Sequence, residues 1–418
     1  MRALGEPGVV VVGGGQAGLA VSHELAGLGV EHTVLERRRV GETWRGRWDS
    51  FCFVTPNWTR SLPGMPYDGD APEGFDHRDE VVRYLERYAA SFGAPVQEGA
   101  EVSSLERSGP RFRLRTSAGD VEADQVVLAT GAYQRPHRPA VADAFPPDLL
   151  VIDAEGYRNA DGLPRGAVLI VGSGQTGCQL AEELRESGRE VFLACGRAPW
   201  GPRRAEGRDM VTWMAETTWF ETPLSALPSP AARLAGNIQL SGRDGGHDLN
   251  YRVLQGMGVR LCGRLAAVEG GRARFADDLA ASVAFGDARY ADVRRALYEQ
   301  LPPKGLRPPQ LPDPPPFRAE APSDVKLAEL AAVIFTSGFR PDYQRWVQLP
   351  AFDDLGFPLA PDGVCEAVPG LYFVGVHFLR TRKSSLMWGV GEDAAIVARH
   401  VAASAGVTGP DRTAPASR

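Results

Sequence analysis

An unbroken hydrophobic run near the start of the chain predicts a buried strand. Residues 9–12 are consecutive valines without polar alternation, which is typical of a parallel strand covered on both faces. After a glycine-rich turn at 13–18, apolar residues recur at roughly helical spacing, so a helix is expected to follow. A second strand is predicted at 31–36, where the sequence EHTVLE ends on a carboxylate. The order of strand, glycine turn, helix and strand indicates an α/β unit.

The same pattern returns in the middle of the chain. Residues 167–177 read AVLIVGSGQTG, and a helical period begins at Leu180. The strand expected at 190–195 is followed by Gly196 and Arg197, and it ends on Cys195 where the first unit has Glu36. The sequence therefore predicts an α/β fold with two Rossmann-like units.

Weaker periodic segments complete the expected organisation. We predict a helix at 76–92, hairpin strands near 102–105 and 111–116, a buried strand at 124–131, a strand at 370–375 and a final helix at 392–403. Residues 330–340 (LAAVIFTSGFR) mirror 124–131, and we expect them to return the chain to the first domain. The predicted domains are 1–160, 161–325 and 326–405, followed by a disordered tail at 406–418.

The first glycine turn has the spacing of a dinucleotide-binding loop. Gly13 permits a tight turn, Gly15 lets backbone N–H groups approach a pyrophosphate, and Gly18 lets the helix pack closely on the strand. Glu36 follows at about the offset of a carboxylate that binds ribose hydroxyls. Since an acid there would repel a 2′-phosphate, we expect the first unit to bind FAD or NAD and not NADP.

The second turn carries the same spacing with the opposite charge at the ribose position. Gly172, Gly174 and Gly177 repeat the frame, whereas the following strand leads to Arg197, with Arg203 shortly after. Arginine suits a 2′-phosphate, so the second unit is expected to prefer NADP.

Composition narrows the function further. The chain has 418 residues and a net charge of −6, and its basic blocks are short, so nucleic acid is not an expected partner. The longest apolar runs are too short to span a membrane, and a signal-peptide cleavage pattern is missing, so we expect a cytoplasmic protein. The five cysteines are scattered singly, which argues against a dithiol reductase and against a metal site.

Several motifs, taken together and in order, resemble class B flavin monooxygenases. They are the first glycine turn with Glu36, GETWRGRWD at 41–49, LPGMPY at 62–67, RDEVVRYLERYA at 78–89, LATG at 128–131, GSGQTG at 172–177 with Arg197, and FTSGF at 335–339. This resemblance covers most of residues 8–400. It implies two three-layer, Rossmann-like domains, with an NADPH-binding domain inserted into an FAD-binding domain.

The resemblance also implies the cofactors and their ligands. FAD would contact Gly13, Gly15, Gln16, Ala17, Gly18, Glu36, Arg37, Trp44, Trp48, Thr130 and Gly131. NADPH would contact Gly172, Gly174, Gln175, Thr176, Gly177, Arg197, Arg203 and Gly338. The aromatic residues at 40–67 are then either a loop layer packed on something flat or a core filled with large rings.

In this family the flavin carries the chemistry. NADPH reduces FAD, O2 adds to give a C4a-(hydro)peroxyflavin, and a small organic substrate is oxygenated, here most readily at nitrogen or sulfur. Baeyer–Villiger oxygenation of a ketone is one alternative, and an NADPH oxidase or reductase without oxygen transfer is another. We expect Thr55 and Asn57 to be donors near the reactive edge of the flavin, although Asn57 equally suits a surface turn. A homodimer is a possible assembly.

One departure from the family pattern lies at 145–157. Tyr157 fits the last place of the FxGxxxHxxx[Y/F] fingerprint, which favours nitrogen or sulfur oxygenation, but Asp153 stands where histidine is expected. The missing histidine is what leaves an enzyme without oxygen transfer as an alternative.

Overall fold

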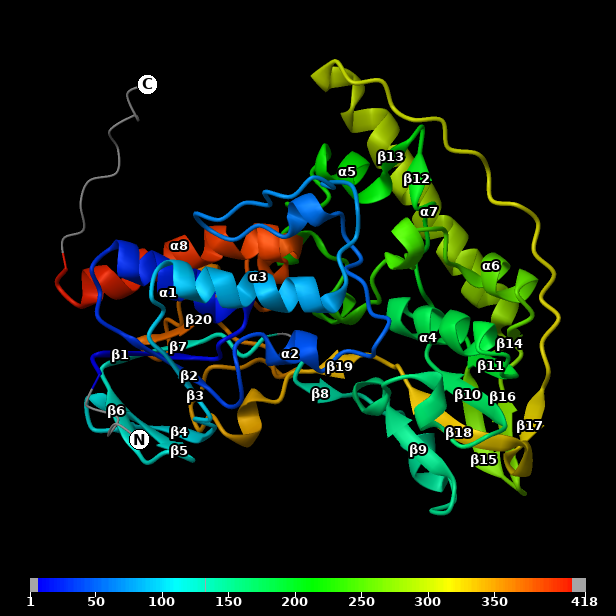
Figure 1. Ribbon diagram of the computed structural model, residues 1–418, viewed down its shortest axis with the longest axis horizontal. Helices are drawn as coiled ribbons and strands as arrows, with labels where there is room; N and C mark the ends of the chain where they lie inside the picture. The colour runs from blue at the N-terminus through cyan, green and yellow to red at the C-terminus, as the bar shows by residue number, and fades with distance from the viewer. Residues whose placement is uncertain (1–6, 132, 408–418) are drawn as a thin grey trace.

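The computed structural model describes residues 7–131 and 133–407, which form two separate five-stranded parallel sheets (Figure 1). The first sheet has the order β20-β7-β1-β2-β3. Its strands are β1 (Val9–Val12), β2 (Thr33–Glu36), β3 (Val96–Glu98), β7 (Gln125–Leu128) and β20 (Leu371–Phe373). The predicted strands around both the first glycine turn and residue 371 are confirmed.

The second sheet repeats this arrangement with the order β14-β11-β10-β18-β9. Its strands are β9 (Leu150–Asp153), β10 (Ala167–Val171), β11 (Val191–Ala194), β14 (Arg260–Cys262) and β18 (Leu330–Phe335). In each sheet the strand that precedes the glycine turn lies at the centre. The crossover to the next strand therefore runs through a helix that begins at the carboxyl edge of the sheet.

Helices cover one face of each parallel sheet, and a three-stranded antiparallel sheet covers the other (Figure 1). In the first unit these elements are α1 (Gln16–Gly27), α3 (Arg78–Ser91), α8 (Met387–Ser404), β4 (Val102–Ser108), β5 (Arg111–Thr116) and β6 (Val121–Ala123). In the second they are α4 (Gln175–Glu186), α6 (Tyr251–Gly256), β15 (Leu265–Glu269), β16 (Arg272–Phe275) and β17 (Asp324–Lys326). The three-layer architecture is confirmed.

The layers explain why the central strands lack polar alternation. In β1, Val9 and Val11 pack against the helices, whereas Val10 and Val12 pack against the antiparallel sheet. In β10, Val168 and Ile170 face α4 and α6 while Leu169 faces the antiparallel sheet. Burying each such side chain contributes about 1.5–3 kcal/mol, and both faces of the strand contribute.

The second unit is inserted into the first, but its limits differ from those expected. Strand β18 pairs in parallel with β10, and β9 pairs with β18, so both strands belong to the second sheet. The prediction that 330–340 returns the chain to the first domain is wrong, and so are the boundaries at residues 160 and 326. The reason is that β18 lies beside the strand of the second glycine turn, β10, just as β7 lies beside the strand of the first, β1.

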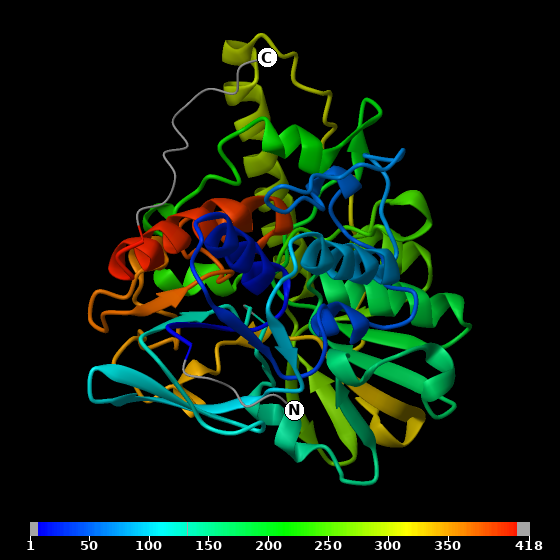
Figure 2. The same cartoon turned by 60° about the vertical axis from the view of Figure 1, so that its left-hand side comes forward.

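The remaining elements elaborate the second unit and the junction. They are α2 (Glu42–Arg45), α5 (Met210–Ala215), α7 (Leu279–Gln300), β8 (Arg135–Pro136), β12 (Arg204–Ala205), β13 (Arg208–Asp209) and β19 (Phe339–Arg340), with short 3-10 turns between them. Figures 1 and 2 show that α7 projects beyond both sheets. A hydrophobic cluster on α5 and α7 reaches Leu386 and Trp388 at the start of α8.

Most of the tail that we expected to be disordered, residues 408–418, lies outside the described residues. Among residues 7–131 and 133–407, every helix is too short or too polar to cross a membrane.

Candidate functional site

The first glycine turn forms a cradle at the N-terminus of α1. Gly13 has a φ of +111°, and a methyl group on it would lie 2.6 Å from the carbonyl oxygen of Ala129 on the neighbouring strand's continuation. A methyl group on Gly18 would lie 1.8 Å from the Gly13 carbonyl oxygen, so only glycine allows this close packing. A methyl group on Gly15 would meet nothing within 4 Å. Gly15 therefore faces open space beside the positive end of the helix, as a phosphate site requires.

Glu36 lies beside this cradle, as predicted. Its carboxylate is buried and accepts hydrogen bonds from the Gly14 N–H (2.7 Å to Oε2) and the Arg38 N–H (2.9 Å to Oε1). Arg37 is exposed at the end of the same strand, and Ala17 is buried on α1. The carboxylate is thereby fixed at the edge of the turn, where a ribose of a bound nucleotide would lie.

The second turn reproduces the first. Gly172 has a φ of +108°, and a methyl group on it would lie 2.7 Å from the Thr336 carbonyl oxygen. A methyl group on Gly177 would lie 2.0 Å from the Gly172 carbonyl oxygen, whereas one on Gly174 would meet nothing within 4 Å. The two cradles thus have the same packed and open positions.

The cradles differ at the ribose position. Cys195 is fully buried at the end of β11, where the first unit has Glu36. Ser173 and Tyr251 share a 2.5 Å hydrogen bond beneath the turn, and the Gly196 N–H donates to the Ser173 hydroxyl (2.8 Å). Arg197 is exposed next to this neutral cluster, with its guanidinium carbon 6.0 Å from the centre of the Phe285 ring. A 2′-phosphate placed here would meet a cation and no carboxylate from the strand.

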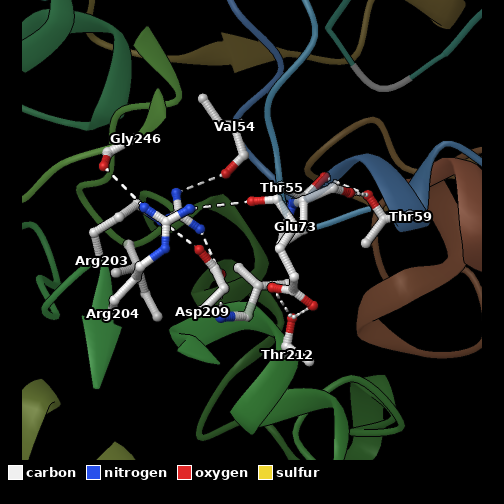
Figure 3. Close-up of polar contacts among 12 residues, drawn as sticks. Val54, Thr55, Thr59, Glu73, Arg203, Arg204, Asp209, Thr212 and Gly246 are labelled. Carbon is white, nitrogen blue, oxygen red and sulfur yellow. Dashed lines mark hydrogen bonds and ion pairs between the residues drawn. The ribbon is translucent and has the colours of Figure 1, made fainter. Parts of the chain in front are cut away.

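Arg203 does not join Arg197, and its predicted contact with NADPH is wrong on physical grounds. Its side chain is 2% exposed and binds the Asp209 carboxylate through two nitrogens, at 2.7 and 2.6 Å (Figure 3). Its third nitrogen donates to the carbonyl oxygen of Val54 (2.9 Å), and the guanidinium lies over the Phe75 ring. Because its three nitrogens bind Asp209 and Val54 and the side chain is buried, the guanidinium is not presented to a phosphate.

Asn57 is also a structural residue in this arrangement. It is 1% exposed, and its amide donates to Ala71 O and to Asp76 Oδ1, both at 3.0 Å, while its carbonyl oxygen accepts from the Asp76 N–H (2.7 Å). Asn57 was predicted as a donor to the flavin or as a surface turn residue, and it is neither. Thr55 shares a 2.6 Å hydrogen bond with Thr59 in the same loop (Figure 3), and its catalytic role stays a prediction.

Several large aromatic residues in the loop at 40–67 are packed in the protein core and do not line a site. Trp48, Phe51 and Phe53 are buried, which favours the alternative of a core of large rings. Trp48 packs into the core of the second unit, so its assignment as a flavin contact is not supported. Trp44 is half-buried, and its indole N–H donates to the Gln16 side chain (3.3 Å) at the first cradle.

The two small-residue turns meet between the units. Gly131 (φ +80°) and Gly338 (φ +86°) end the two equivalent strands, and the segments after them pair as β8 and β19. Thr130 accepts a hydrogen bond from Gln134 (2.9 Å). In the second unit, Gln175 binds the Ile238 carbonyl (3.1 Å) beside Thr176 on the first turn of α4. The cofactor residues predicted on 130–131 and 338 therefore lie where the two units meet, and those on 175–176 lie at the start of α4.

Three residues at this junction were missed by the sequence analysis. The guanidinium carbon of Arg47 lies 6.0 Å from the Tyr133 ring centre, and Tyr133 packs edge-on against His377 (5.0 Å). Burial lowers the pKa of His377 to about 4, so the imidazole is neutral, and its Nδ1 lies 2.7 Å from the Ser385 hydroxyl. Tyr133 and His377 each follow the carboxyl end of a parallel strand, a position that could have identified them.

The two fingerprint residues lie on the second unit. Asp153 ends β9 and forms an ion pair with Arg138, at 2.8 and 3.0 Å. Tyr157 is buried, and its hydroxyl donates to Glu183 on α4 (2.7 Å), which together with burial raises the pKa of Tyr157. Tyr157 thus anchors the helix that carries the second cradle.

The cysteines and His247 have structural surroundings in this fold. All five cysteines are free, and four of them are buried. Burial raises the pKa of the Cys262 thiol to about 12 and that of Cys195 well above its usual value. His247 binds Glu182 (2.6 Å), and within the described ranges three metal-ligating side chains are nowhere grouped. These thiols are unsuited to thiolate chemistry.

Paired glycine cradles on two three-layer units suit a protein that binds two dinucleotides. A family profile described as pyridine nucleotide-disulphide oxidoreductase matches residues 10–219, half of the chain. The chain belongs to this family of oxidoreductases. Flavin monooxygenases are among the relatives and solved structures to which it is similar, in agreement with the resemblance. The predicted use of FAD with a nicotinamide nucleotide agrees with the family.

Individual relatives agree with this assignment. An uncharacterized CzcO-like oxidoreductase of Geobacillus kaustophilus is 30% identical, with 92% of this chain and 95% of that protein covered. Indole-3-pyruvate monooxygenase YUCCA1 of Oryza sativa is 32% identical over 45% of this chain and 47% of its own length. Among solved structures, a flavin-containing monooxygenase of Stenotrophomonas maltophilia has a TM-score of 0.63 at 20% identity, covering 96% of this chain and 99% of that one.

Proposed function

We propose that this protein is an NADPH- and O2-dependent flavin monooxygenase that oxygenates a small organic substrate at a nucleophilic nitrogen or sulfur. The single observation that carries the proposal is the contrast between the two cradles. Glu36 fixes a carboxylate beside the first, while Cys195 is neutral and Arg197 is cationic beside the second. Such a pair suits two different adenine nucleotides, of which only the second carries a 2′-phosphate.

The residues of the first cradle fit FAD. The open position at Gly15 leaves room for a pyrophosphate, which the backbone N–H groups and the positive end of α1 would stabilise. Glu36 would accept hydrogen bonds from ribose hydroxyls. Bound FAD supplies hydride acceptance and reaction with O2. The neutral His377 and the ring of Tyr133 would lie at the junction that the two nucleotides share.

The second cradle fits NADPH by the same argument. Gly174 leaves room for the pyrophosphate, and Arg197 would pair with the 2′-phosphate from an exposed position. Arg47 is a further cation at the junction, and burial lowers its pKa. We infer that Arg47 faces the nicotinamide half of the bound nucleotide, because it contacts Tyr133 between the two units.

The thiols argue for oxygen and against a disulfide as the electron acceptor. The solved structures that share the fold include a bacillithiol disulfide reductase of Staphylococcus aureus, with a TM-score of 0.58. A dithiol mechanism needs two accessible cysteines beside the flavin. In this chain the cysteines are single and free, and burial or neighbouring charge raises the pKa of each.

The proposal is tested by following oxygen into product. The FAD-loaded protein is incubated with NADPH and ¹⁸O2 in the presence of amines, thioethers and ketones, and the ¹⁸O content of the products is measured by mass spectrometry. We expect one labelled oxygen atom per NADPH consumed in an amine or thioether product. A labelled ester from a ketone would instead establish Baeyer–Villiger oxygenation.

A second candidate is an NADPH oxidase without oxygen transfer. Asp153, where the family fingerprint has histidine, is held by Arg138 in an ion pair and supplies no imidazole. If this position matters for oxygen transfer, NADPH oxidation yields hydrogen peroxide in equal amount for every substrate tried. That stoichiometry would overturn the monooxygenase proposal.

A further inference from the structure

The segment between β20 and α8 carries three cations, two of which are neutralised. Arg380 Nε donates to Asp393 (2.8 Å), and Arg380 also binds Glu392. Lys383 Nζ lies 2.5 Å from both Glu221 and Glu392. These carboxylates therefore pair with the cations on either side of Arg382.

Arg382 is the third cation, and its surroundings are aromatic. Its guanidinium carbon lies 4.4 Å from the Trp219 ring centre and 4.9 Å from that of Phe378. Its Nε donates to the Trp219 carbonyl oxygen (3.2 Å). Within residues 7–131 and 133–407, no carboxylate lies within 4.0 Å of this guanidinium. Burial lowers the pKa of Arg382 to about 10, so the group remains a cation at neutral pH.

A half-buried cation without a counter-charge is costly, and the two rings offset only part of that cost. Each cation–π contact contributes about 0.5–2 kcal/mol, and it engages the faces of the guanidinium. The two Nη atoms remain available as a planar, bidentate hydrogen-bond donor, which matches a carboxylate in both shape and charge. The ligand that would complete the surroundings of Arg382 is thus a planar anion.

The turn that carries Arg382 also touches the first cradle and is rigidly built. Residues Arg382–Ser385 form the 3-10 helix η12, which a reciprocal capping box between Thr381 and Ser384 closes. The carbonyl oxygen of Ser385, at the other end of η12, accepts from the Gln16 side chain (2.7 Å). Gln16 follows Gly15 at the start of α1, so η12 fixes Arg382 at one end and contacts the FAD cradle at the other.

We propose that Arg382 binds the carboxylate of the organic substrate, and that this enzyme acts on organic carboxylic acids. This inference rests on the proposed function, because it identifies the substrate class of the same enzyme. The competing explanation is that Arg382 has only a structural role, as a cation packed between two aromatic rings. Such a role uses the faces of the guanidinium but not its Nη atoms.

The test measures binding of phenylacetate and of its uncharged analogue phenylacetamide to the FAD-loaded protein, by calorimetry and by the change in flavin absorbance. Wild type should bind the acid at least about tenfold more tightly than the amide, since a charge-assisted bidentate pair is worth more than about 1.4 kcal/mol. Arg382→Met should abolish this preference. Arg382→Lys, which keeps the charge but loses the fork, should reduce it. Arg318→Met, at a residue whose side chain is 90% exposed, should leave it unchanged.

Equal affinity for acid and amide in wild type would overturn the inference. So would an acid preference that survives in Arg382→Met or, if the Met variant fails to fold, a preference that Arg382→Lys leaves undiminished. The measurement needs neither NADPH nor oxygen. A protein that binds the acid through Arg382 yet releases only hydrogen peroxide would therefore refute the proposed function and leave this inference standing.

Discussion

Adding one methyl group to the second cradle at two different glycines should have two different effects. In Gly174→Ala the new Cβ meets no protein atom within 4 Å and occupies only the space where a pyrophosphate would lie. In Gly177→Ala the Cβ would lie 2.0 Å from the Gly172 carbonyl oxygen and 2.7 Å from the Thr336 hydroxyl. The first substitution should therefore impair binding alone, and the second should strain the fold.

The expected magnitudes follow from these distances. Loss of a backbone hydrogen bond to a charged phosphate costs about 1.5–3 kcal/mol, which corresponds to about a 10- to 100-fold increase in the Kd for NADPH in Gly174→Ala. Overpacking in Gly177→Ala costs about 1–3 kcal/mol of folding free energy, because the strand and α4 must move apart. FAD content should stay at one per chain in Gly174→Ala.

Two assays separate these effects. NADPH titration of the FAD-loaded protein, followed by fluorescence, gives the Kd, and thermal unfolding without NADPH gives the Tm. We expect a raised Kd with an unchanged Tm for Gly174→Ala, and a lowered Tm for Gly177→Ala. The reasoning fails if Gly174→Ala lowers the Tm as much as Gly177→Ala does, or if Gly174→Ala binds NADPH like wild type.

Three further predictions concern residues away from the cradles. Arg203→Met leaves the Asp209 carboxylate buried and unpaired, which should cost about 3–5 kcal/mol and lower the Tm without changing the preference for NADPH over NADH; a lost preference at full stability would contradict this. The hydrogen bond to Glu182 raises the pKa of His247, so its stabilisation is complete below the unfolded pKa of about 6.5 and is lost as pH rises through the folded pKa. Urea unfolding of wild type and His247→Gln should therefore converge as the pH rises above about 6.5, and a gap that widens would refute the assignment. Iodoacetamide under native conditions should leave NADPH oxidation unchanged, because the thiols are buried or have a raised pKa; inactivation would indicate a cysteine in the reaction.

Local pattern was enough to find both cradles. The valine run, the glycine frame and the terminal Glu36 are all set within about 30 residues of chain, and their geometry follows from that stretch. Strand β18 was placed in the wrong sheet because its sequence, hydrophobic and then Thr-Ser-Gly, resembles that of β7. Pattern identifies the type of strand, whereas the sheet it joins depends on which glycine turn it meets.

Residues whose role depends on distant partners could not be assigned in the same way. Arg197 and Arg203 both follow the same strand and are equally plausible phosphate ligands from sequence alone. Only Arg203, however, lies within hydrogen-bond distance of Asp209 and the Val54 carbonyl oxygen. Asn57 was misjudged because its two side-chain partners, Ala71 and Asp76, lie 14 and 19 residues further along the chain. Conversely, His377 became visible only when the fold brought it to Tyr133.

The central claim, that the second cradle is built for a 2′-phosphate and the first is not, is tested most directly by comparing NADP⁺ and NAD⁺ affinities. The FAD-loaded wild type, Arg197→Ala and the control Arg204→Ala are each titrated with both nucleotides. Arg204 is a suitable control because its exposed guanidinium binds the carbonyl oxygens of Gly245 and Glu73. We predict at least about a tenfold preference for NADP⁺ in wild type and Arg204→Ala, lost in Arg197→Ala with FAD content intact. Equal affinities in wild type, or a preference that survives in Arg197→Ala, would contradict the account.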